Sequence, residues 1–332
     1  MASETYPVFD VRTPSEFEKG HIPGAVNLPL FNDEERAVVG TLYKQESREA
    51  AVMKGLEIAG PKLAGLAAQA RRMAVDNTVL LHCWRGGMRS ESLAWLFRTA
   101  GLHASVLKGG YKAYRAHFRE MLHSVDWKFV VLGGPTGCGK TDILKALESS
   151  GEQVLDLEGL ACHKGSAFGA LGQAPQPTTE QFENDLHEAF RHFDARRIIW
   201  VEGESHSIGR VYMPDLLFEQ LMQAPLVMFE LEKERRLDRL VHEYGDFAQD
   251  SLAHSVRRIE KRLGGTRTRQ ALEALEAGDY RAVAQIALQY YDKGYAKSLG
   301  KRNAPVLTLR ADEDDPLQTA SELIKNKDIC TK

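Results

Sequence analysis

The sequence predicts an α/β protein with two domains, each built on a mostly parallel sheet. Short apolar runs that are typical of buried strands alternate with longer segments whose apolar residues recur at helical spacing. The length of 332 residues favours two hydrophobic cores over one. Because a new run of strand-forming residues begins at Trp127, we expect a first domain over 1–125 and a second domain over 126–332.

Composition and charge exclude several classes of protein. The apolar content of 43% is typical of soluble globular domains, and no apolar run approaches the roughly 18 residues that a membrane span needs. The first residues lack the basic and apolar regions of a secretory signal, so we expect a cytoplasmic protein. The cysteines form no C-x-x-C pair, which predicts reduced thiols and neither a disulfide framework nor a zinc site; they are Cys83, Cys138, Cys162 and Cys330.

The first domain opens with a strand, a short helix and a second strand. An extended run covers 6–11, and Thr13 then has Glu16 three residues later, which fits a capping box at the start of a helix. A second extended run covers 25–28. The segment 31–74 has a helical pattern and joins these elements to the rest of the domain.

A cysteine lies in a glycine-containing loop between a predicted strand over 78–82 and a predicted helix over 91–97. A turn from strand to helix directs backbone N–H groups and the positive end of the helix dipole at one point, which stabilises a thiolate and an anion beside it. Arg85 and Arg89 add positive charge. We therefore expect a lowered pKa for Cys83 and predict that its thiolate is a catalytic nucleophile.

The same loop fits the phosphate-cradling pattern His-Cys-x5-Arg-Ser, counted from His82 to Ser90. It could seat a phosphate-sized anion, and the candidate binding residues are Arg85, Gly86, Gly87 and Arg89. A cysteine-dependent phosphatase would also have this pattern, but the sequence offers no evident general acid for it. The structural alternative is a small buried side chain, and two nearby arginines argue against that role.

Two stretches are locally basic although the net charge of the chain is −3. Seven Lys or Arg stand against one acid over 85–119, and six stand against one over 251–270. In each stretch the basic residues share a helical face, which predicts contacts with RNA phosphates, whereas a solvated surface is the plain alternative. The candidates are Lys112, Arg115 and Arg119 in the first domain, and Arg257, Arg258, Lys261, Arg262, Arg267 and Arg269 in the second.

The second domain opens with a complete phosphate-loop motif. The run from Gly134 to Thr141 fits G-x-x-x-x-G-K-[ST] and lies between an apolar strand over 127–132 and an amphipathic helix over 142–148, the context this motif requires. Its backbone would surround a phosphate, its lysine would reach terminal oxygens and its threonine could ligate Mg²⁺. The phosphate-binding candidates are Gly134, Gly137, Gly139, Lys140 and Thr141.

Two glutamates follow the apolar run 198–201, which predicts a buried strand. In a domain with a phosphate loop, the end of such a strand is where an acid that holds Mg²⁺ or acts in catalysis would lie. Glu202 is therefore the first candidate and Glu204 the second, although the usual residue is aspartate and a strand cap is the structural alternative. Further core strands are expected over 153–157, 226–229 and 304–309, with a helical region over 232–299.

Three motifs in the first domain resemble those of rhodanese-like domains. The first runs from Asp10 through Glu16 to Ala25, the second is the Cys83 loop, and the third is Leu107-Lys108-Gly109-Gly110-Tyr111. Joined to the phosphate loop, they resemble the tRNA 2-selenouridine synthase family, as do the segments 156–158, 163–166 and 201–205. The resemblance implies a transferase that converts wobble 2-thiouridine to 2-selenouridine through S-geranylation from geranyl diphosphate and then selenium transfer from selenophosphate.

This implied chemistry divides between the two loops. We expect Cys83 and a bound selenophosphate to serve the selenium step, and the phosphate loop around Lys140 to hold geranyl diphosphate, with Mg²⁺ as a candidate ion and ATP as the alternative ligand. The expected partners are the anticodon region of tRNA and the enzyme that produces selenophosphate. The alternative function is a cysteine-dependent phosphatase or a sulfurtransferase coupled to a P-loop kinase.

Overall fold

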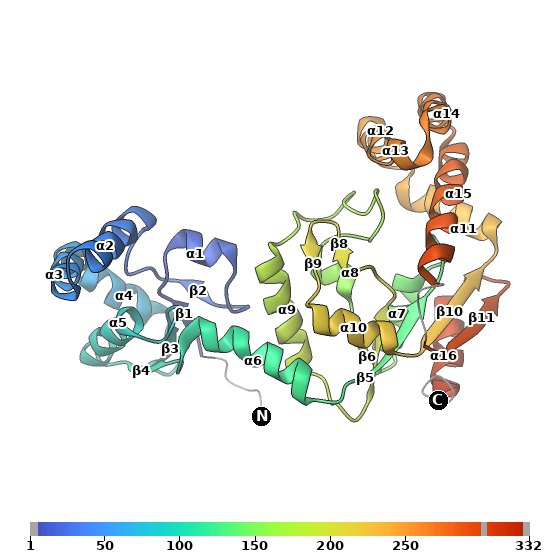
Figure 1. Cartoon of the computed structure of the whole chain (residues 1–332). Coiled ribbons are helices and arrows are strands. Elements are labelled where there is room, and N and C mark those ends of the chain that lie inside the picture. The colour runs from blue at the N-terminus through green and yellow to red at the C-terminus, as the bar shows by residue number, and fades with distance from the viewer. Residues whose placement is uncertain (1–5, 300–303, 328–332) are drawn as a thin grey trace. The chain divides into compact units, whose positions relative to one another are not determined.

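The computed structural model describes residues 6–299 and 304–327, so Cys330 lies outside the described residues. The chain forms two compact units, Met1–Met121 and Leu122–Lys332, whose elements are labelled in Figure 1. Both units are α/β, which confirms the predicted fold class. Within the described ranges, no helix combines the length and the apolar character needed to cross a membrane.

The first unit has a parallel sheet in the order β2-β1-β3-β4. Its strands are β1 (Val8–Asp10), β2 (Val26–Asn27), β3 (Thr78–His82) and β4 (His103–Val106). Its helices are α1 (Pro14–Lys19), α2 (Asp33–Gln45), α3 (Arg48–Ala59), α4 (Leu63–Met73), α5 (Met88–Thr99) and α6 (Gly110–Ser124), with a 3₁₀ turn at Gly60–Lys62. The helical segment expected over 31–74 is thus divided among α2, α3 and α4.

Packing in the first unit fixes where β3 ends and α5 begins. Phe9 of β1 and Phe97 of α5 are fully buried and meet edge to face, with ring centroids 6.3 Å apart. The predicted capping box is confirmed, because the Thr13 side chain accepts from the Glu16 N–H and the Glu16 carboxylate accepts from the Thr13 N–H. The loop between β3 and α5 is therefore anchored at both ends, because both elements pack into the buried core of the first unit.

The second unit has a parallel sheet in the order β11-β10-β5-β7-β6. The strands are β5 (Lys128–Gly133), β6 (Gln153–Leu155), β7 (Ile198–Glu202), β10 (Leu226–Leu231) and β11 (Val306–Ala311). Helices α7 (Lys140–Ser149) and α16 (Pro316–Lys325) pack against each other and share the sheet's apolar core. Because β5 and β7 are parallel neighbours with Leu132 opposite Glu202, the phosphate loop and Glu202 lie at the same sheet edge.

Further elements surround this sheet. They are α8 (Leu157–Leu160), α9 (Thr179–Arg191), the antiparallel pair β8 (Ser207–Ile208) and β9 (Val211–Tyr212), and α10 (Asp215–Gln223). The strand expected over 153–157 ends at Leu155, because the Asp156 side chain accepts a hydrogen bond from the Gly159 N–H at 2.7 Å and caps α8 instead.

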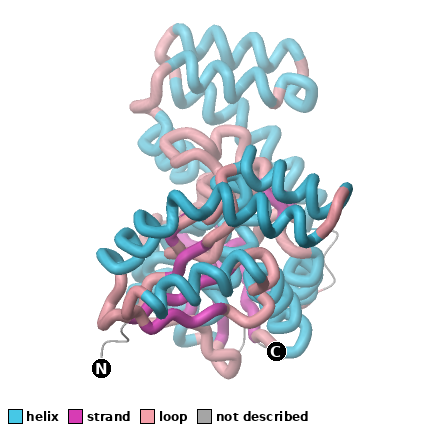
Figure 2. Tube along the Cα trace, turned by 90° about the vertical axis from the view of Figure 1, so that its left-hand side faces the viewer, coloured by secondary structure: helices cyan, strands magenta, loops and turns pink. Residues whose placement is uncertain are grey.

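The helical region comprises α11 (Lys233–Tyr244), α12 (Gln249–Arg258), α13 (Glu260–Leu263), α14 (Gly265–Glu276) and α15 (Tyr280–Leu299). Helices α12 to α14 stand at the far end of α15, away from the sheet of the second unit, at the top of Figures 1 and 2. The helical region expected over 232–299 is interrupted between α12 and α13, since Ile259 has φ −99° and ψ 4°. Ile259 and Leu263 are both buried, opposite the basic side chains of this stretch.

Candidate active sites

The Cys83 loop joins β3 to α5 and packs backbone against backbone on the next turn. Gly86 has φ +64°, and a Cβ there would lie 2.6 Å from the Leu107 carbonyl oxygen. A Cβ on Gly110 would lie 2.4 Å from the Cys83 carbonyl oxygen, which accepts from the Tyr111 N–H at 2.9 Å. Only glycine fits such an approach, so the Gly-Gly pairs of the second and third predicted motifs hold the cysteine loop in place.

The Cys83 thiol is 4% exposed and surrounded by hydrogen-bond donors. Its Sγ accepts from the Gly87 N–H at 3.3 Å and from the Ser90 hydroxyl at 3.2 Å. Burial by itself raises the pKa of the thiol, but the Ser90 side chain and the N–H groups of Ser90, Arg85 and Gly87 outweigh it. The pKa of Cys83 is therefore lowered, as the sequence predicts, and the thiolate is favoured.

The two arginines of this loop are not the main cause of the lowered Cys83 pKa. Arg89 forms an ion pair with Glu16, with Nη1 and Oε2 2.6 Å apart, and Arg85 is exposed. Hydrogen bonds, with Ser90 as the largest contributor, favour the Cys83 thiolate instead. Ser90 is a functional residue that the arginine argument missed, although the serine at the end of the His-Cys-x5-Arg-Ser pattern was the available signal.

A buried ion pair forms the floor of this loop. Arg12 is 1% exposed, and its Nη2 lies 2.5 Å from Asp10 Oδ2. The guanidinium carbon is 3.8 Å from the centroid of the Tyr111 ring, a cation–π contact. His82 is fully buried, and burial lowers its pKa, so this ring is neutral. Arg12 and Asp10 therefore have a structural role beneath the loop, and the neutral His82 does not supply an acid to the substrate.

The phosphate loop joins β5 to α7. Gly137 and Gly139 have φ +79° and +87°, a conformation that glycine adopts readily, and Gly139 is the N-cap residue of α7. A Cβ on Gly134 would lie 2.6 Å from Cys138 Sγ, so this buried thiol fills the space beneath the loop. Backbone N–H groups at the start of a ten-residue helix make this loop an anion site.

Lys140 extends under the phosphate loop. Its Nζ donates to the Gly134 carbonyl oxygen at 3.1 Å. Burial lowers the pKa of Lys140, but Cys138 and the carboxyl groups of Glu204 and Glu158 outweigh it, so the pKa is raised. The ammonium group therefore stays charged at neutral pH and can neutralise a bound phosphate.

Three glutamates gather beside Lys140. Glu202 is 3% exposed, its Oε1 accepts from the Glu158 N–H at 2.6 Å, and its Oε2 is buried with no hydrogen-bond partner among the described residues. Glu204 forms a hydrogen bond with the Glu158 side chain. Burial raises the pKa of Glu202 well above its usual value and that of Glu204 to about 8. Both predicted acids thus lie near the lysine, and Glu204 holds a proton near neutral pH.

Glu158 is the acid that the sequence reasoning missed. It lies on α8, after the neighbouring strand β6, and burial raises its pKa. The Thr141 hydroxyl donates to Glu158 Oε2 at 3.3 Å. No local pattern marks Glu158, and only the resemblance of the segment 156–158 pointed to it.

A magnesium ion at the phosphate loop would need few protein ligands. Within residues 6–299 and 304–327, no three His, Cys, Asp or Glu side chains are arranged to hold a metal ion. Mg²⁺ beside a phosphate needs only one or two protein ligands, because phosphate oxygens and waters supply the others. The Thr141 hydroxyl and the Glu158 carboxylate, 3.3 Å apart, fit that mode of binding.

Side chains of α11 and α15 form hydrogen bonds with the backbone of the phosphate loop. Arg236 of α11 donates through Nε to the Thr136 carbonyl oxygen at 2.9 Å, and its Nη2 lies 2.5 Å from Asp292 Oδ1. The Tyr295 hydroxyl of α15 accepts from the Gly134 N–H at 2.6 Å. These residues lie at least 100 positions from the loop in sequence, so no local motif predicts their contact with it.

The candidate RNA-binding side chains lie on two separate surfaces, one in each unit. On α6, Lys112 and Arg119 are exposed and Arg115 is partly exposed. Over α12 to α14 the candidates are exposed while the apolar face is buried; they are Arg257, Arg258, Lys261, Arg262, Arg267 and Arg269. Both placements fit the predicted division into a basic and an apolar face.

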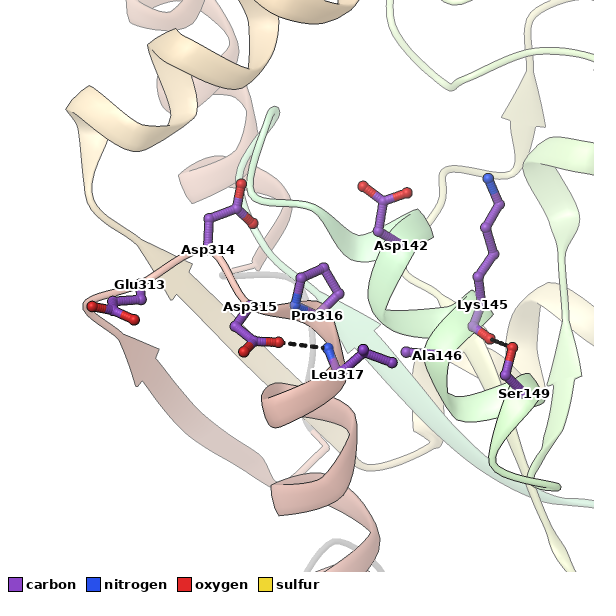
Figure 3. A pocket seen from close by; sticks show the side chains of 9 residues that line it. All are labelled: Asp142, Lys145, Ala146, Ser149, Glu313, Asp314, Asp315, Pro316 and Leu317. Atoms are coloured by element: carbon purple, nitrogen blue, oxygen red, sulfur yellow. Dashed lines mark hydrogen bonds between the residues drawn. The ribbon is translucent and has the colours of Figure 1, made fainter.

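A wide hollow of about 520 Å³ lies between α7 and the segment that starts α16 (Figure 3). Its lining holds one lysine, Lys145, against four acids, namely Asp142, Glu313, Asp314 and Asp315. Asp315 Oδ1 accepts from the Leu317 N–H at 3.0 Å and caps α16. Arg239 pairs with Asp142 and Asp314, but the acids still outnumber the basic groups, so this hollow suits a phosphate group less well than the phosphate loop does.

The folds and the two loops define the class of protein, a rhodanese-like domain followed by a P-loop domain. Comparison with family models agrees with this class. The model of the rhodanese-like domain matches residues 1–117, and the model described as the tRNA 2-selenouridine synthase AAA domain matches residues 127–326.

Curated relatives give the particular family. A tRNA 2-selenouridine synthase of Sulfurovum sp. is 36% identical and covers 93% of each chain. The enzyme of that name from Hahella chejuensis is 38% identical over 89% of this chain and 86% of the relative. Among solved structures, a tRNA isopentenylpyrophosphate transferase of Bacillus halodurans covers 60% of this chain and 96% of its own, with 12% identity and a TM-score of 0.34. The chain belongs to the tRNA 2-selenouridine synthase family.

Proposed function

We propose that this protein converts 2-thiouridine at the wobble position of tRNA to 2-selenouridine in two transfer steps, one at each loop. The observation that carries the proposal is the pair of anion-binding loops in one chain. One loop holds Cys83 with a lowered pKa, and the other holds the charged Lys140. Two different anionic co-substrates, geranyl diphosphate and selenophosphate, match two such loops.

In the first step, the phosphate loop holds the diphosphate of geranyl diphosphate. The sulfur at C2 of the base attacks C1 of the geranyl group, and the bond from C1 to the diphosphate oxygen breaks. Diphosphate leaves with the electron pair, and the N3 proton of the base is lost to a basic group or to water. Lys140 neutralises the negative charge that develops on diphosphate, and Mg²⁺ held by Thr141 and a nearby acid would add to this effect.

In the second step, selenophosphate binds in the Cys83 loop. The Cys83 thiolate attacks phosphorus, the P–Se bond breaks, and selenium leaves with the electron pair as hydroselenide. Hydroselenide attacks C2 of the S-geranylated base, and geranylthiolate leaves. Water then cleaves the S–P bond and releases phosphate, which restores the thiol. A thiolate stabilised by Gly87 and Ser90 fits this role.

The basic side chains of α6 and of α12 to α14 are proposed to bind the anticodon region of tRNA through its phosphates. We place this chemistry in the cytoplasm, where an enzyme that produces selenophosphate would supply the donor. Replacing Arg257 and Arg258 together by glutamine should weaken tRNA binding and reduce its salt dependence, without changing the binding of geranyl diphosphate.

Reconstitution tests the proposed function. The pure protein is incubated with 2-thiouridine tRNA, geranyl diphosphate and selenophosphate, and the nucleosides are identified by mass. We expect S-geranyl-2-thiouridine with geranyl diphosphate alone and 2-selenouridine with both donors. A reaction that needs ATP and ignores geranyl diphosphate would instead assign the phosphate loop to a nucleotide. Release of phosphate from an aryl phosphate, with no modification of the tRNA, would favour the phosphatase alternative.

A further inference from the structure

An apolar cavity of about 50 Å³ lies beside the phosphate loop, and no step above uses it. One wall is the face of α15 that carries Val283, Ala284 and Ala287. Leu240 of α11 and Phe168 supply further walls. Side chains in protein interiors are closely packed and leave few voids. An apolar cavity beside an anion site therefore points to a bound ligand.

The cavity and the phosphate loop share a wall. Thr136 belongs to both, and Arg236 fixes it by donating to its carbonyl oxygen at 2.9 Å. Leu240 lines the cavity, and a Cβ on Gly137 would lie 3.1 Å from Leu240 Cγ. A molecule whose phosphate end is held by the loop therefore has an apolar space next to it.

Three polar side chains of the cavity wall, Ser166, Tyr244 and Tyr291, are hydrogen-bonded to protein groups. The Tyr291 hydroxyl accepts from the Ala167 N–H at 2.9 Å. The Ser166 side chain hydrogen-bonds the hydroxyl groups of Tyr244 and Tyr291. The wall thus offers aliphatic groups and ring faces to a ligand. The polar edge of a nucleobase needs hydrogen-bond partners when it is buried, whereas a hydrocarbon chain needs none, so the mainly apolar wall favours a hydrocarbon chain.

We propose that this cavity binds the hydrocarbon chain of geranyl diphosphate while the phosphate loop holds its diphosphate. The inference rests on the proposed function and adds the residues that select the chain. The isoprene unit farther from diphosphate lies in the cavity, where Ala284 and Ala287 leave room for it. The nearer unit passes Thr136.

Binding of two ligands that differ only in the chain tests this assignment. Ala284→Leu should narrow the cavity and weaken equilibrium binding of geranyl diphosphate at least tenfold, while binding of inorganic diphosphate stays within twofold. Dimethylallyl diphosphate, which lacks the farther isoprene unit, should be affected less than geranyl diphosphate. The matched control is Ala282→Leu, on the same helix and outside the cavity lining, which should leave all three affinities unchanged.

Each result separates the cavity from the proposed function. Equal affinity of the unmodified protein for geranyl diphosphate and diphosphate, or no effect of Ala284→Leu, overturns the cavity assignment even if reconstitution yields geranylated tRNA. A loss of geranyl diphosphate binding in the variant supports the cavity whatever the later chemistry. If thermal unfolding shows that Ala284→Leu does not fold, the smaller change Ala287→Val is measured in the same way.

Discussion

The Cys83 loop and the phosphate loop use one backbone arrangement for two kinds of chemistry. Each joins a parallel strand to a helix, and each has glycine at positive φ where the chain turns: Gly86 in the first loop, and Gly134, Gly137 and Gly139 in the second. In the first loop the N–H donors point at the protein's own sulfur, so the loop activates a nucleophile. In the second loop a lysine lies below the backbone, so the loop neutralises a ligand. The side chain that accompanies the turn, and not the turn itself, decides the reaction.

The two loops also differ in the groups that balance their charge. Neutral hydrogen bonds stabilise the Cys83 thiolate, and the nearby Arg89 is neutralised by Glu16. Around Lys140 the balancing groups are buried glutamates that can hold protons, Glu158 and Glu204. Because these acids can be protonated near neutral pH, they need not repel an anion that enters the phosphate loop, whereas the cysteine loop has no such pair of acids. Substitutions in the two loops should therefore have separable effects.

The largest effect is expected for Cys83→Ser. A serine hydroxyl is not ionised at neutral pH and cannot attack phosphorus as a thiolate does, so 2-selenouridine formation should fall below detection. Geranylation of 2-thiouridine tRNA should remain within twofold, since it uses the other loop. Mass analysis of the nucleosides measures both steps in one assay. Retained selenation would remove Cys83 from the mechanism.

Lys140→Ala should impair the other step, geranylation, and leave selenation intact. Removing the ammonium group should lower geranylation about 100-fold or more, because the charge that develops on diphosphate is no longer neutralised. Selenation of tRNA that already carries the S-geranyl group should be unchanged. Lys145→Ala, at an exposed position on the same helix, is the matched control. Normal geranylation by a folded Lys140→Ala protein, together with loss of an ATP-dependent activity, would favour a nucleotide ligand.

The contrast also explains which features could be predicted from sequence. Both loops, the order of the main strands and the acids at Glu202 and Glu204 followed from local patterns, since a strand, a turn and a helix leave contiguous signals. Glu158, Arg236 and Tyr295 did not, because tertiary folding brings them to the loop from distant positions. The sequence also predicted the wrong main cause for the lowered pKa of Cys83, for a related reason. A sequence shows that Arg89 is near, but not that Glu16 has already paired with it.

Ser90→Ala should have an intermediate effect that depends on pH. Loss of the hydroxyl donor raises the pKa of Cys83, so less thiolate is present at pH 7 and selenation should slow about tenfold for each unit of increase. The rate should recover as the pH is raised through the new pKa. The thiolate absorbance, taken as a difference from Cys83→Ser, reports this pKa directly. Ser92→Ala, exposed on the same helix, should leave the profile unchanged, and an unshifted profile in Ser90→Ala would refute the hydrogen-bond account.

The smallest effect is expected for Glu204→Gln and concerns stability. The folded protein holds a proton on Glu204 up to a pKa of about 8, whereas the unfolded chain releases it near the ordinary value of 4.5. Between these two values the folded state binds more protons, so its free energy of unfolding falls as pH rises, at most by about 1.4 kcal/mol per pH unit. Glutamine does not titrate, and the variant should lose less stability between pH 5 and pH 8 in thermal unfolding. Glu148→Gln, at an exposed position, should keep the slope of the unmodified protein. If all three slopes agree, Glu204 is ionised in the folded protein, and a protonated glutamate beside Lys140 is excluded.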